Sequence, residues 1–120
     1  MPLASQLMVL ALALNVIILV PVITALVRGG AAAAVFGDAT PARAILTSIY
    51  AAIALVSLGL IALHVAAAPW AVPMTVALFA VQIVYKALTV PAVGLRNPVV
   101  VVNLVVVLVQ AGVLAVLWAG

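Results

Sequence analysis

The chain has 120 residues, of which 72% are apolar and only 4% are charged, and its net charge is +3. Soluble domains usually contain about a quarter charged residues, and a domain of this size is too small to bury so much apolar surface. The composition therefore excludes an ordinary soluble fold and indicates a chain embedded in lipid. The four basic residues are isolated from one another, so we expect no nucleic-acid partner.

Four apolar stretches follow one another along the chain, at residues 3–27, 43–66, 72–91 and 98–118. Each reaches the length of about 20 residues that a helix needs to cross the hydrocarbon core. Lipid offers no partner to backbone polar groups, so each stretch is predicted to be a helix. The first stretch is too long for a signal peptide and has no basic residue before it, so we expect it to remain as a span. The expected fold is an all-α integral membrane protein: one domain over residues 1–120, a four-transmembrane-helix bundle with short connections.

Prolines mark the expected ends of these helices. Thr40-Pro41 and Asn97-Pro98 each place a capping side chain before a proline that suits the first helical position. Pro21 lies inside the first span and is expected to kink it near one end. The first connection is the longest, and its 31–36 run is a candidate for a short helix at the membrane surface.

The basic residues predict the orientation. Arg28 and Arg43 flank the first connection, while Lys86 and Arg96 flank the third. Positive charge favours the cytoplasmic side, which places connections 28–43 and 91–98 in the cytoplasm and both termini outside. The expected location is a prokaryotic plasma membrane. Trp70 and Trp118 would then lie together at the outer boundary, where indole rings are favoured.

Polar side chains recur inside the predicted spans at seven-residue spacing, which keeps them on one face of each helix. Counting along the helices places one polar residue of each span near the midplane: Asn15, Ser57, Gln82 and Gln110. Hydrogen bonding between helices is the favoured interpretation of this set, and a narrow polar pathway or a ligand site at the bundle centre is the alternative. A second layer toward the cytoplasm is a candidate contact for an anion, a lipid or a partner, and comprises Tyr50, Tyr85, Lys86 and Asn103.

Two single residues allow sharper alternatives. Lys86 lies five residues before Pro91, so its side chain is expected to extend to the cytoplasmic headgroups. The alternative is an inward-facing cation that binds an anion, a quinone, a lipid headgroup or a partner carboxylate. His64 is a weak candidate ligand, for instance to haem shared between subunits, and a hydrogen-bonded histidine at the interface is favoured. No cofactor or metal site is predicted.

Three functions are compatible with these features. The first is a non-catalytic accessory subunit of a larger membrane assembly, because the chain has minimal loops, no acid–base pair and polar stripes that could face other subunits. The second is a homo-oligomeric channel or facilitator for a small solute, lined by the midplane set. The third is a lipid- or quinone-binding membrane protein that uses Lys86 and Tyr85. Autonomous catalysis is not expected.

Overall fold

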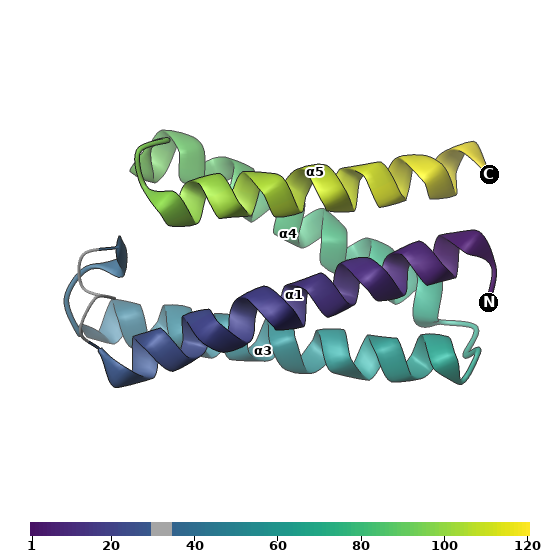
Figure 1. Cartoon of the computed structure of the whole chain (residues 1–120), viewed down its shortest axis with the longest axis horizontal. Helices are drawn as coiled ribbons and strands as arrows, with labels where there is room; N and C mark the ends of the chain where they lie inside the picture. Colours follow the sequence, from purple (N-terminus) through teal and green to yellow (C-terminus); the bar gives the residue numbers. More distant parts are fainter. Residues whose placement is uncertain (30–34) are drawn as a thin grey trace.

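The computed structural model describes residues 1–29 and 35–120. Its four long helices are α1 (Leu3–Arg28), α3 (Pro41–Val65), α4 (Ala71–Val93) and α5 (Pro98–Ala119), shown in Figure 1. They contain 22 to 26 residues, which corresponds to about 33–39 Å, and each is long and apolar enough to cross a membrane. The predicted all-helical class is therefore confirmed for the described residues. The short helix predicted at 31–36 lies mostly outside them.

The helix starts follow the capping signals in the sequence. The Thr40 side chain accepts a hydrogen bond from the Arg43 amide at 3.3 Å, and Asn97 accepts one from the Val99 amide at 2.9 Å. Each cap satisfies one of the amides that a helix leaves free at its first turn. At the other end of α4, the helix continues through Pro91 to Val93, two residues beyond the predicted end. A proline removes one hydrogen bond of the helix but does not have to end it.

The turn between α3 and α4 has an unusual residue at its centre. The Ala68 amide bonds the Leu63 carbonyl at 2.9 Å and the Ala67 amide bonds the His64 carbonyl at 3.0 Å. This pair of bonds is a Schellman motif, which ends many helices with a left-handed residue. Alanine occupies that position here, with φ of 55° for Ala67, where glycine is the usual choice. The motif reverses the chain within five residues and brings α4 back along the bundle.

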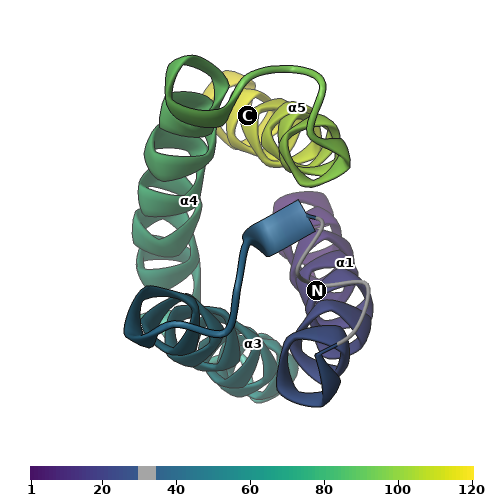
Figure 2. The same cartoon turned by 90° about the vertical axis from the view of Figure 1, so that its left-hand side faces the viewer.

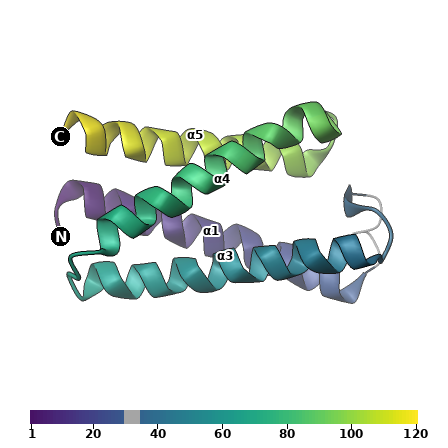
Figure 3. The same cartoon turned by 180° about the vertical axis from the view of Figure 1, so that it is seen from behind.

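The helices surround one common interior, which Figure 2 shows end-on. α1 packs mainly against α3, and α4 packs mainly against α5. In Figure 3, α4 runs diagonally from the turn after α3 to the start of α5. Both termini and the 66–70 turn lie at one end of the bundle in Figure 1. We call the other end the arginine end, because Arg28 closes α1, Arg43 lies in the first turn of α3 and Arg96 lies between α4 and α5.

The distribution of polarity is inverted relative to a soluble protein. Large apolar side chains such as Ile17, Leu55 and Leu108 are 68–73% exposed on the outer faces of the helices. Among the described residues, nine that are polar or charged are buried inside: Ser5, Asn15, Ser57, His64, Thr75, Gln82, Lys86, Asn103 and Gln110. In water this arrangement would expose the apolar surface and desolvate the polar groups, both at a cost. In lipid the outer surface carries no such cost.

Candidate functional site

The centre of the bundle is occupied by the four polar residues that the sequence places near one level. Asn15, Ser57, Gln82 and Gln110, which we call the amide cluster, are each at most 1% exposed and come from four different helices. The Asn15 Nδ2 donates to Gln82 Oε1 at 2.8 Å and to Ser57 Oγ at 3.3 Å. The Gln110 Nε2 donates to Gln82 Oε1 at 2.8 Å and to Asn15 Oδ1 at 3.3 Å. A longer bond of 3.4 Å runs from Gln82 Nε2 to Asn15 Oδ1.

These bonds use the carbonyl oxygens of Asn15 and Gln82 as shared acceptors, so the cluster ties all four helices together. Apolar groups lie on both sides of it: Met8, Leu12 and Phe79 toward the termini, Leu19 and Ile53 toward the arginine end. Ser57 bonds to an amide, which cannot act as a base, so the cluster has no activated nucleophile. Among the buried side-chain atoms described, Gln110 Oε1 has no hydrogen-bond partner. The arrangement favours packing over passage, because its groups bond to each other.

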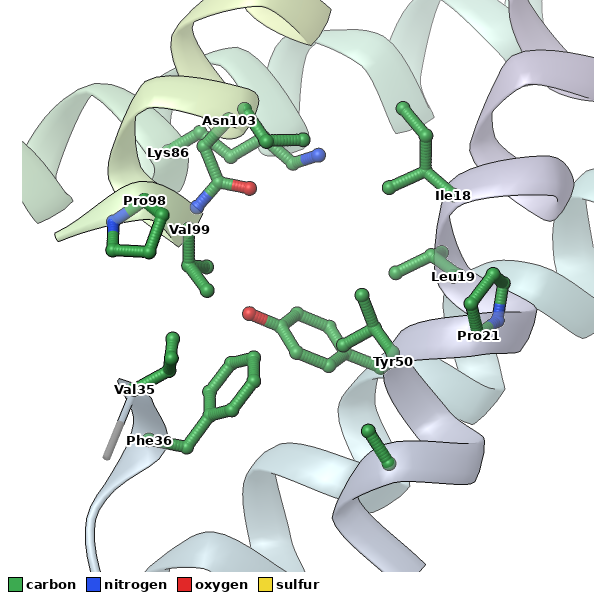
Figure 4. A pocket seen from close by; sticks show the side chains of 13 residues that line it. Ile18, Leu19, Pro21, Val35, Phe36, Tyr50, Lys86, Pro98, Val99 and Asn103 are labelled. Carbon is green, nitrogen blue, oxygen red and sulfur yellow. The ribbon is translucent and has the colours of Figure 1, made fainter. Parts of the chain in front are cut away.

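A pocket of about 360 Å³ lies between this cluster and the arginine end. The walls are mostly apolar and come from α1 and α5, with Ile18, Leu19 and Val22 facing Val99 and Val102. Three polar residues face the same space: Tyr50 of α3, Lys86 of α4 and Asn103 of α5. Figure 4 shows the Lys86 and Tyr50 side chains extending into the space between α1 and α5. The pocket thus has apolar walls and one polar corner, which we define by Tyr50, Lys86 and Asn103.

Helix geometry explains why these polar residues lie on the same side of the amide cluster. Lys86 follows Gln82 by four residues, while Tyr50 precedes Ser57 by seven and Asn103 precedes Gln110 by seven. Because α3 and α5 run opposite to α4, all three steps lead from the amide cluster toward the arginine end. Three of the four residues predicted for the inner layer therefore meet at one pocket. Tyr85, the fourth, packs against the apolar cluster that contains Leu19, Tyr50 and Ile53. Its hydroxyl is buried without a hydrogen-bond partner among the described residues.

The orientation of Lys86 differs from the favoured expectation. The side chain does not extend to the surface; it is 3% exposed and turns inward, with its ammonium 5.9 Å from the centre of the Tyr85 ring. The reason is the face on which it lies. Gln82 and Lys86 are one turn apart on the buried side of α4, so the bonds that hold Gln82 inside also hold Lys86 inside. The inward orientation agrees with the alternative expectation, and what Lys86 binds stays a prediction.

The pocket is covered at the arginine end and open at its side. Val35 and Phe36 contribute to its lining, and Phe36 packs edge-on against Tyr50 with ring centres 6.3 Å apart. The Val35 carbonyl accepts a hydrogen bond from Asn97 Nδ2 at 2.9 Å. Figure 2 shows this segment lying over the middle of the bundle end. The exposed residues among the lining are Pro21, Ala25, Pro98 and Val102, so the opening lies between α1 and α5.

Sequence reasoning missed the apolar walls and the cover of this pocket. Ile18, Leu19 and Val22 resemble every other apolar residue of the first span, and no pattern marks the side that faces a cavity. Val35 and Phe36 reach the pocket through the path of the first connection, which their own residue types do not encode. Pro21 was the one available signal, because a proline inside a membrane helix often lies beside a cavity or a neighbouring polar group.

His64 forms a separate buried pair near the opposite end. Its Nε2 lies 2.9 Å from Thr75 Oγ1, and that hydroxyl donates its only proton to the Ala71 carbonyl at 2.7 Å. The imidazole must then donate from Nε2, since Thr75 has no second proton to give. Within residues 1–29 and 35–120 no three His, Cys, Asp or Glu side chains lie close enough to hold a metal ion. The pair links α3 to α4 beside their turn.

No protein-family model, no curated protein and no solved structure matches the chain. What the chain can bind therefore has to follow from its own residues and their arrangement.

Proposed function

We propose that the chain is an integral membrane protein that binds one lipid-soluble amphiphile in the pocket between α1 and α5. The observation that carries this proposal is the opening between α1 and α5, where the exposed lining residues Pro21, Ala25, Pro98 and Val102 belong to two apolar helices. An apolar chain could enter from the lipid and leave its polar end beside Tyr50, Lys86 and Asn103. Pockets of about 300–1,000 Å³ with a few polar groups are typical of small-molecule sites.

The inverted polarity and the helix lengths support the membrane location. Each helix is longer than the hydrocarbon thickness of about 30 Å. The longest dimension of the molecule is 43 Å, which matches the thickness of a bilayer with its headgroups, about 40–45 Å. We propose that the arginine end faces the cytoplasm, because Arg28, Arg43 and Arg96 all lie there. A bacterial or archaeal plasma membrane is the membrane that we propose.

The accessory-subunit and channel hypotheses both need polar side chains that face a partner or a pore. The amide cluster instead bonds to itself and is at most 1% exposed, so no specific observation favours either function. Both stay predictions. Mass spectrometry of the gently purified protein would test the first, and flux into liposomes would test the second.

The binding proposal is tested by filling the pocket. In nanodiscs, a stearic acid that carries a diazirine should crosslink saturably to lining residues of α1 and α5. Val22→Trp should abolish this crosslinking, because an indole occupies the space that Val22 borders. Ile17→Trp is the matched control, since Ile17 is 68% exposed and should leave the saturable crosslinks unchanged. Unsaturable crosslinks spread over the outer faces, insensitive to Val22→Trp in a folded protein, would overturn the proposal.

A further inference from the structure

The polar corner of the pocket contains a buried cation with no partner of opposite charge. Lys86 is 3% exposed, and the chain has a single acidic residue, Asp38, which is exposed in the first connection. A buried charge without compensation is costly, and ionisable groups at membrane depth are usually paired. Lys86 follows the amide cluster by one turn and precedes the end of α4 by seven residues, about 10 Å. The ammonium therefore lies inside the bundle beside the pocket, and no acidic side chain of the described residues lies within ion-pair distance.

The groups around Lys86 favour an acceptor. An ammonium offers three donors and no acceptor, and the Asn103 amide and the Tyr50 hydroxyl of the same corner can each donate as well as accept. A carboxylate or phosphate accepts from all of these and also compensates the charge, with bonds roughly twice as strong as neutral ones. A quinone carbonyl or an alcohol would also accept hydrogen bonds but would leave the charge uncompensated.

The apolar walls of the pocket indicate that the rest of the ligand is apolar. From the polar corner, the apolar side chains of Leu19, Val22 and Val102 lead to the opening between α1 and α5. An acyl chain in this position would leave the protein sideways into the lipid. Val35 and Phe36 line the pocket on the side of the arginine end. A free inorganic anion would fill only the polar corner.

We infer that the ligand is an acidic amphiphile, a molecule with one acyl chain region and an anionic head held by Lys86. This inference rests on the proposed function, which by itself requires only an amphiphile. It makes Lys86 the residue that selects acidic heads over neutral ones, with Asn103 and Tyr50 as supporting donors.

Competition against the diazirine probe tests the selectivity. In the wild-type protein, oleate should displace the probe at least about tenfold better than oleyl alcohol, which has the same chain without the charge. Lys86→Met should remove this difference by weakening oleate while oleyl alcohol competes as before. Because the acidic probe would itself bind this variant more weakly, stearyl alcohol that carries the same diazirine serves as the probe there. Lys86→Arg should keep the preference. Leu88→Met, 61% exposed on the same helix, is the control and should behave as wild type.

Further outcomes separate the two proposals. Equal competition by oleate and oleyl alcohol in the wild-type protein would overturn the acidic-head inference and leave the binding proposal standing. Unsaturable crosslinking with every probe would overturn both. A preference for oleoyl lysophosphatidic acid over oleate, each with a single oleoyl chain, would support the inference and identify phosphate as the head, and the reverse order would identify carboxylate. Removing a buried charge is often neutral for stability, so we expect Lys86→Met to fold, and a melting temperature raised by oleate only in the wild type gives a second readout.

Discussion

The Gln82 side chain accepts the two shortest hydrogen bonds of the central network. Its carbonyl oxygen accepts from both Asn15 and Gln110 at 2.8 Å, and its own amide donates to Asn15. Interhelical hydrogen bonds in membranes contribute about 0.6 kcal/mol on average, but a buried donor left without an acceptor costs about 1–3 kcal/mol. Loss of Gln82 removes the acceptor of one N–H of Asn15 and one N–H of Gln110 in the apolar centre. The cost of losing Gln82 therefore comes mainly from these unsatisfied donors.

Gln82→Leu should therefore lower the free energy of unfolding by about 1–3 kcal/mol, measured by denaturant titration in mixed micelles. Val84→Leu, at a position 60% exposed on the outer side of the same helix, should change it by less than about 0.5 kcal/mol. A Gln82→Leu protein as stable as wild type would show that the amide cluster does not hold the helices together.

At the scale of elements, the Asn97 side chain makes two hydrogen bonds, one through its oxygen and one through its nitrogen. Its Oδ1 caps α5 by accepting from the Val99 amide, and its Nδ2 donates to the Val35 carbonyl, both at 2.9 Å. The first bond is local to the helix, while the second joins the α4–α5 connection to a segment more than sixty residues earlier. The start of α5 and the cover of the pocket therefore depend on the same side chain.

Two substitutions should separate these two hydrogen bonds. Asn97→Asp keeps an acceptor for the helix start and loses the donor to Val35, so we expect faster amide hydrogen exchange at residues 35–37 with little change at Val99 and Val100. Asn97→Ala loses both bonds and should also destabilise the protein by about 1–2 kcal/mol. If Asn97→Asp leaves exchange at 35–37 unchanged, the bond to Val35 does not hold the cover in place.

For the whole molecule, the two ends differ in charge. The three arginines lie at one end, and the termini with the 66–70 turn lie at the other. Since the chain has no cysteine, single cysteines report on each end without background. The ends chosen for labelling are Ala39 at the arginine end and Ala66 at the turn, both exposed.

With the arginine end in the cytoplasm, Ala66→Cys should react with a membrane-impermeant maleimide in intact cells. Ala39→Cys should react only after the membrane is permeabilised. The opposite pattern would reverse the proposed orientation. Labelling of both positions in intact cells, with the protein still in the membrane fraction, would show that the helices do not span the bilayer.

The sequence by itself determined the helices and their starts. Long apolar stretches leave the backbone no partners other than its own, and Thr40-Pro41 and Asn97-Pro98 act within a single turn, so both features follow from local chemistry. It also determined the common level of Asn15, Ser57, Gln82 and Gln110, because depth along a helix is fixed by counting residues. These are properties of one helix at a time.

Only the tertiary structure decided which neighbours each face meets. The inward turn of Lys86, the meeting of Tyr50 with Asn103 and the cover by Phe36 depend on how α4 crosses the bundle and where the first connection runs. A long flexible side chain can reach either the surface or the interior from the same helix position, and packing selects between them. The pocket is a space between helices, so no single stretch of sequence encodes it.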